Sequence, residues 1–118
     1  MQNNKSDNLV IKLSFGFSLK VLKYVAAMNP DYRSSIGQQL LKSATSIGAN
    51  VREAQNAESK ADFIHKFKIA AKEADETEYW LELCNHSGEF DPCFELLNDI
   101  GALIRVLSKI ISTAKQKG

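Results

Sequence analysis

The stretch QQLLKSATSIGANVREAQNAESKADFIHKFKIAAKEADETEYWLELC, residues 38–84, contains two amphipathic segments separated by a short break. In the second segment, apolar or small residues recur alternately four and three positions apart, as in a helix that packs against other helices. These residues are Phe63, Phe67, Ala70, Ala74, Thr77, Leu81 and Cys84. Ser59 precedes them as a helix N-cap, with Asp62 three residues on. The stretch therefore predicts a helical hairpin, with helices at about 35–57 and 60–85.

The segment before the hairpin has two competing patterns. Alternating apolar residues over 9–21 fit a strand, whereas a second set fits one face of a helix. The helical set is Phe15, Leu19, Leu22 and Val25. We favour a helix over about 13–28, ended by Asn29 and Pro30 because a residue before proline avoids the α region. Residues 1–12 are expected to form an extended lead-in.

A fourth helix is predicted over about 92–115, with Asp91 as N-cap and Pro92 at its first position. One apolar stripe consists of Leu97, Ile100, Ile104, Leu107, Ile111 and Ala114. A second stripe consists of Leu96, Leu103 and Ile110. This face is wider than one bundle seam needs, and a large exposed apolar patch usually has a partner. We therefore assign the second stripe as a candidate interface between subunits.

Four helices with short connections predict an all-α fold, an up-down-up-down antiparallel four-helix bundle formed by residues 13–118 as a single domain. The length of 118 residues suits one compact domain.

No apolar run approaches the roughly 18 residues that span a bilayer. The N-terminus lacks the layout of a signal peptide, so a cytoplasmic location is expected, with Cys84 and Cys93 as free, buried thiols.

The small residues of SATSIGANVREAQ, residues 43–55, predict close packing between the two hairpin helices. If the hairpin closes near residues 58 and 59, Ser43 faces Ala74 and Ser46 faces Ala71. Small facing residues let helices approach at or below the usual spacing of about 8–10 Å. The predicted close-packing residues are Ser43, Ser46, Gly48, Ala70, Ala71 and Ala74.

Two polar residues in that stretch need a different explanation. Asn50 and Glu53 are expected to meet polar groups of the next helix, because a buried amide needs hydrogen-bond partners. The candidate partners are Glu73, Glu76 and Tyr79. Such a cluster would either set the helix register or form a functional polar site, and the sequence leaves both alternatives open.

The blocks QLLKSATSIGANVREAQ and SKADFIHKFKIAAKEADETEYWLEL, with LSFGFSLKVLKY more weakly, resemble the four-helix bundle family first described from intervening sequences in bacterial 23S rRNA genes. Members have often been labelled ribosomal proteins. The resemblance implies a short up-down bundle, commonly a homopentamer, without enzymatic activity. The accessory variability protein of diversity-generating retroelements is similar to this family. That relative binds nucleic acid and a reverse transcriptase, which implies RNA or DNA and a partner protein as expected partners.

No catalytic or metal site is expected. Phosphate-binding glycine loops are absent from the sequence. Glu82 and His86 could share a helix face, but two ligands without a third make a weak metal site. His65 has no recognisable nucleophile or activating partner. We therefore expect no cofactor and no small-molecule substrate.

Charge divides the predicted bundle into two ends. The end with the start of the first helix and the second connection holds eleven basic and four acidic residues. The opposite end holds four basic and ten acidic residues, so the net charge is only +1. The nucleic-acid-binding candidates at the basic end are Arg52, Lys60, Lys66, Lys68, Lys72, Arg105 and Lys109. The alternatives are solvated surface charge and a protein-interaction scaffold without a nucleic-acid role.

Overall fold

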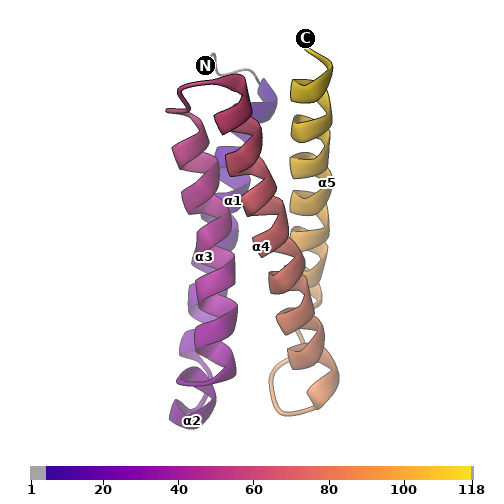
Figure 1. The fold of residues 1–118 in the computed structure, drawn as a ribbon. Coiled ribbons are helices and arrows are strands. Elements are labelled where there is room, and N and C mark those ends of the chain that lie inside the picture. The colour runs from indigo at the N-terminus through magenta and orange to yellow at the C-terminus, as the bar shows by residue number, and fades with distance from the viewer. Residues whose placement is uncertain (1–4, 118) are drawn as a thin grey trace.

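The computed structural model describes residues 5–117 and consists of helices joined by short loops (Figure 1). The helices are α1 (Lys5–Ala26), α2 (Pro30–Arg33), α3 (Ile36–Ala54), α4 (Lys60–Ser87) and α5 (Phe94–Gln116). The four long helices lie side by side in a body of 48 × 21 × 19 Å. No strand occurs in the part of the chain described, which confirms the predicted all-α class.

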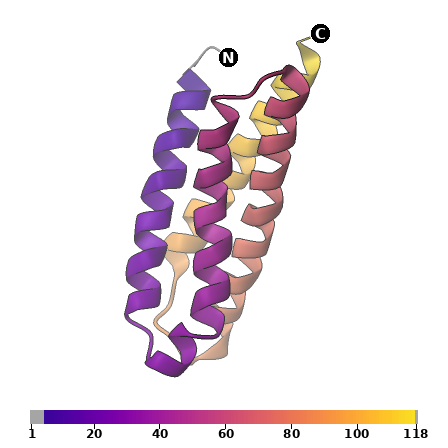
Figure 2. The same ribbon diagram turned by 60° about the vertical axis from the view of Figure 1, so that its left-hand side comes forward.

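The long helices pack in a closed square. Contacts join α1 to α3, α3 to α4, α4 to α5, and α5 back to α1. Figure 2 shows α1 and α3 side by side with α5 behind them. The α3–α4 connection lies at the same end as the C-terminus, and α2 lies at the opposite end (Figure 1). This arrangement confirms the up-down-up-down bundle.

The core seam predicted on α4 is confirmed residue by residue. The structure buries Phe63, Phe67, Ala70, Ala74, Thr77, Leu81 and Cys84. The helix begins as predicted, because Ser59 Oγ accepts a hydrogen bond from the backbone N–H of Asp62 at 3.0 Å. It ends at Gly88, whose φ of +76° favours glycine.

The predictions for the N-terminal segment need two corrections. The helix α1 already begins at Lys5, so an extended lead-in over 1–12 is wrong where the structure describes it; residues 1–4 lie outside the described part. The predicted helical face is also wrong apart from Val25. The core row instead contains Val10, Ser14, Phe17, Val21 and Val25.

The exposed fractions on α1 explain the error. Phe15 is 58% exposed, and Leu19 and Leu22 are each 47% exposed. Apolar residues occupy much of the circumference of this helix, so the spacing of apolar residues in the sequence is compatible with two different buried faces. Only packing against α3 and α5 decides which face is buried.

The α5 helix requires a similar correction. Leu96, Leu103 and Ile110 are at most 6% exposed, so they form the core of their own bundle and the predicted subunit interface there is wrong. The helix begins at Phe94, with Cys93 as N-cap, rather than at Pro92. The Cys93 N–H instead donates to Asn85 Oδ1 at 3.0 Å, which ties the loop to α4.

The short helix α2 was not predicted. Asn29 caps it by accepting a hydrogen bond from the Tyr32 N–H at 3.1 Å, and Pro30 occupies its first turn. This single turn carries the chain from α1 to α3. Among the described helices, none combines the length and hydropathy that a bilayer crossing requires.

Candidate nucleic-acid interface

The small residues of α3 divide between two neighbouring helices. Ser43 and Thr77 are fully buried, and the Thr77 hydroxyl donates to Ser43 Oγ at 2.9 Å. This bond places Thr77, one turn beyond Ala74, opposite Ser43, so the predicted register is displaced by about one turn. Gly48 faces α1 instead, since a Cβ there would meet Ser14 at 3.6–3.7 Å.

The burial of these residues agrees with the close-packing prediction only in part. Ala70 and Ala74 are fully buried in the α4 seam, as the prediction requires. Ala71 and Ser46 are half-buried at the edge of the contact. The sequence pattern identified small residues correctly but did not show that α3 also contacts α1 through them.

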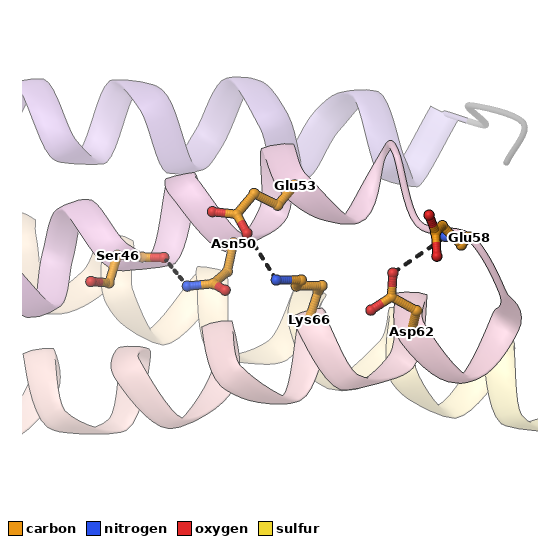
Figure 3. Close-up of polar contacts among 6 residues, drawn as sticks. All are labelled: Ser46, Asn50, Glu53, Glu58, Asp62 and Lys66. Atoms are coloured by element: carbon orange, nitrogen blue, oxygen red, sulfur yellow. Dashed lines mark hydrogen bonds and ion pairs between the residues drawn. The ribbon is translucent and has the colours of Figure 1, made fainter.

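The predicted polar cluster does not form. Asn50 Nδ2 donates to the carbonyl of Ser46 at 2.9 Å, within its own helix (Figure 3). Glu53 turns to Lys66 of α4, with Oε1 and Nζ 2.9 Å apart (Figure 3). An amide that bonds one turn back needs no partner on the neighbouring helix. The prediction that Asn50 meets Glu73 or Glu76 is therefore wrong.

The three expected partners on α4 have other contacts. Glu73 offers only its backbone carbonyl, 2.8 Å from Thr77 Oγ1. Glu76 Oε2 accepts a hydrogen bond from Trp80 Nε1 at 3.4 Å. The Tyr79 ring is 57% exposed and packs edge-on against Trp80, with ring centroids 5.2 Å apart.

The basic candidates lie in the half of the bundle that contains the α3–α4 connection and the end of α5, with Lys72 and Arg105 near the middle of their helices. We call this surface the basic end: Arg52 of α3, Lys60, Lys66, Lys68 and Lys72 of α4, and Arg105 and Lys109 of α5. All are exposed except the half-buried Lys66. The end of α3, the start of α4 and the end of α5 lie on the same side of the molecule in Figure 1, which explains why residues far apart in sequence share it.

Pairs of candidates lie one turn apart on their helices. Lys68 and Lys72 are four residues apart on α4, as are Arg105 and Lys109 on α5, so each pair shares a helix face. The Arg105 guanidinium lies along α5 toward Gly101, where a Cβ would be 3.6 Å from Nη1. Each pair therefore offers two positive groups at a separation of about one turn.

Two of the candidates are engaged by protein groups. The hydrogen bond and the charge of Glu53 raise the pKa of the Lys66 ammonium. Lys60 Nζ donates to the backbone carbonyl of Lys117. The loop that joins α3 to α4 is held by Asp62, whose Oδ2 accepts a hydrogen bond from the Glu58 N–H at 3.3 Å (Figure 3). Among the side chains that the structure describes, the other five candidates form no ion pair.

Sequence reasoning missed an apolar surface on α1. Phe15, Leu19 and Leu22, spaced four and three residues apart on one face of the helix, are between 47% and 58% exposed. Leu9 and Leu13 are also exposed but lie on another side of α1, where Leu13 lines a hollow with residues of α5. The sequence did contain a sign of this surface, because the apolar residues of this segment fit both a strand-like and a helical spacing. Lys20 of the same helix forms ion pairs with α5: its Nζ lies 2.8 Å from Asp99 Oδ2 and 3.0 Å from Glu95 Oε2.

No group of three or more His, Cys, Asp or Glu side chains that could hold a metal ion occurs within the described part of the chain. Both cysteines are buried and unpaired, as expected.

Comparison with known proteins places this bundle in a family. Residues 6–112 match the family described as 23S rRNA-intervening sequence protein. A crystal structure of a protein with unknown function from the S23 ribosomal protein family of Bacteroides thetaiotaomicron is 40% identical, with a TM-score of 0.81. The match covers 91% of this chain and 98% of that chain. No curated protein matches the chain. The chain therefore belongs to the family of 23S rRNA-intervening sequence proteins.

Proposed function

We propose that this protein is a non-enzymatic, cytoplasmic accessory protein that binds nucleic acid, RNA in particular, through the basic end. Phosphate contacts from lysine and arginine supply sequence-independent affinity, because each contact releases condensed counterions. The family's connection with 23S rRNA genes makes RNA the first nucleic acid to test.

The observation that carries this proposal is the separation of charge along the bundle. Of the seven basic-end side chains, Lys66 forms an ion pair and Lys60 donates to a backbone carbonyl; the other five form no ion pair with a described group, so their charge is available to a ligand. The opposite end is acidic and would repel a polyanion. A nucleic acid would therefore approach the molecule from one direction.

We also propose that the protein self-associates through the exposed apolar surface of α1. Apolar patches of this kind on soluble proteins commonly mark interfaces. Copies arranged in parallel, as in the homopentamer that the family resemblance implies, would bring several basic ends onto one face. Repeated phosphate contacts would then add up across the assembly.

The direct test is to titrate structured RNA and duplex DNA at two salt concentrations. We expect binding at low salt. The logarithm of the affinity should fall linearly with the logarithm of the salt concentration, and each substitution that removes a phosphate contact should make this slope shallower by about one. Absence of binding to either nucleic acid at low salt would contradict the proposal. That result would favour the competing function, a scaffold that presents the bundle to a partner protein such as a reverse transcriptase.

A further inference from the structure

A groove opens on the bundle surface at the end remote from the basic end. It has a volume of about 610 Å³ and lies between α2, the start of α3 and the second half of α4. Its apolar lining comes from Tyr32, Ile36, Trp80, Leu83 and Phe90. No basic-end residue lines it, so it is a separate surface.

Aromatic side chains give the groove a defined shape. The rings of Tyr32 and Phe90 pack edge to face, with centroids 4.8 Å apart and planes at 73°. The half-buried Trp80 is held by its Nε1 hydrogen bond to Glu76, and Leu83 is 40% exposed. Ordered aromatic side chains next to an exposed leucine form a surface that can bind bulky apolar side chains, since rigid aromatic groups lose little conformational entropy on binding.

Carboxylates surround these apolar groups. Glu89 lines the groove itself, and Glu76 is bonded to Trp80. Leu83 also lines a second hollow on the outer face of α4, which adds further acidic side chains. These are Asp75, Glu78 and Glu82.

Positive charge near the groove is sparse. Arg33 is the basic residue of α2, and Lys42 is the first on α3; neither lines the groove. His86 lines the adjoining hollow on α4. The electrostatic surroundings therefore favour a positively charged ligand and disfavour nucleic acid.

We propose that this groove binds a basic amphipathic peptide segment of a partner protein. The segment's bulky apolar side chains would sit against Trp80, Leu83 and Phe90, and its Lys or Arg side chains would approach Glu89 and the carboxylates of α4. Such a helix-in-groove or extended-peptide contact combines apolar anchors with charge complementarity. The proposal uses none of the residues of the proposed nucleic-acid surface and stands independently of it.

Trp80 makes the binding directly observable. It is the single tryptophan of the chain, so its fluorescence reports on this groove alone. The probe is a synthetic amphipathic peptide of leucine and lysine, titrated at low salt. Two control peptides separate the contributions: one replaces every lysine by glutamate, and the other replaces every leucine by alanine.

The proposal expects a saturable change in Trp80 emission with the leucine–lysine peptide and much weaker binding by both controls. Leu83→Asp and Glu89→Lys should each weaken binding by about tenfold, the effect of losing one good contact. Glu58→Lys makes the same charge change at the opposite end and should leave the affinity within about twofold of wild type. Circular dichroism confirms that each variant is folded.

Three outcomes would overturn the proposal. The first is no change in Trp80 emission at low salt with any peptide. The second is binding that Leu83→Asp and Glu89→Lys leave unchanged. The third is a change in Trp80 emission with protein concentration alone, which would assign the groove to a second copy of this chain.

Discussion

The hydroxyl of Thr77 on α4 donates to Ser43 Oγ on α3 at 2.9 Å, and both residues are fully buried. Ser43 Oγ in turn donates to the carbonyl of Leu40 at 3.1 Å. Each hydroxyl thus has an acceptor inside the apolar contact between the hairpin helices, and Thr77 Oγ1 also lies 2.8 Å from the Glu73 carbonyl. A buried polar group that loses its partner costs the full penalty of its desolvation.

Thr77→Val keeps the shape of the side chain and removes this bond. We expect the free energy of unfolding to fall by about 1–2 kcal/mol. Urea denaturation monitored by circular dichroism measures the change. The Ser43→Ala/Thr77→Val double variant should lose less than the sum of the single variants, because both act on the same bond. Strict additivity would show that the bond contributes nothing.

Two helical glycines should respond oppositely to alanine. At Gly37 a Cβ would lie 3.0 Å from Val25 Cγ1 and 3.1 Å from the Tyr32 carbonyl oxygen, so Gly37→Ala should destabilise the protein. At Gly48 the nearest atom is Ser14 Oγ at 3.6 Å, an ordinary contact. Gly48→Ala should therefore stabilise the protein by up to about 1 kcal/mol, because alanine favours the helix. Thermal unfolding of the two variants tests the opposite signs.

High pH should weaken the fold through buried acids. Burial, with the nearby Cys93 thiol, raises the pKa of the Cys84 thiol from 9.0 to about 11, and burial also raises the pKa values of Cys93 and Tyr24. A raised pKa means that the folded state holds the proton more tightly. The contribution of the Cys84 thiol to the free energy of unfolding is therefore fully present below pH 9.0 and is lost as the pH rises toward about 11.

Urea unfolding at successive pH values above neutrality measures this loss. Cys84 alone should contribute up to about 3 kcal/mol of it, since its pKa rises from 9.0 to about 11 and one pKa unit corresponds to about 1.4 kcal/mol. A Cys84→Val variant should show a shallower decline over the same range. Stability that is constant or increases across this range would be inconsistent with buried, protonated thiols.

The exposed α1 surface should control self-association. Phe15→Asp combined with Leu19→Asp places charge on this surface without touching the core, since both side chains are about half exposed. We expect light scattering to find an oligomer for the wild type and a folded monomer for this variant. Thr45→Asp with Ser112→Asp, at exposed positions on α3 and α5, is the control and should remain oligomeric. An unchanged mass for the α1 variant would exclude this surface as the interface.

The reliability of the sequence predictions follows the contrast between helix faces. In α4 charged residues lie between the apolar positions of the seam, so the buried face is distinct in the sequence. Every predicted core position of α4 is buried. In α1 and α5 the apolar residues extend around much of the helix, so the sequence identified the helices but not their buried faces. Side-chain partners were less predictable still: Asn50 bonds within α3, and only the fold shows that Glu53 reaches Lys66.

The most direct test of the central claim compares two matched charge reversals in an RNA-binding measurement at low salt. Lys68→Glu with Lys72→Glu alters the basic end, whereas Lys23→Glu with Lys42→Glu makes the same charge change at exposed sites toward the other end. We predict that the first pair weakens binding at least about tenfold and reduces the salt slope by about two, while the second pair leaves the slope unchanged. Equal effects of the two pairs would contradict binding through the basic end.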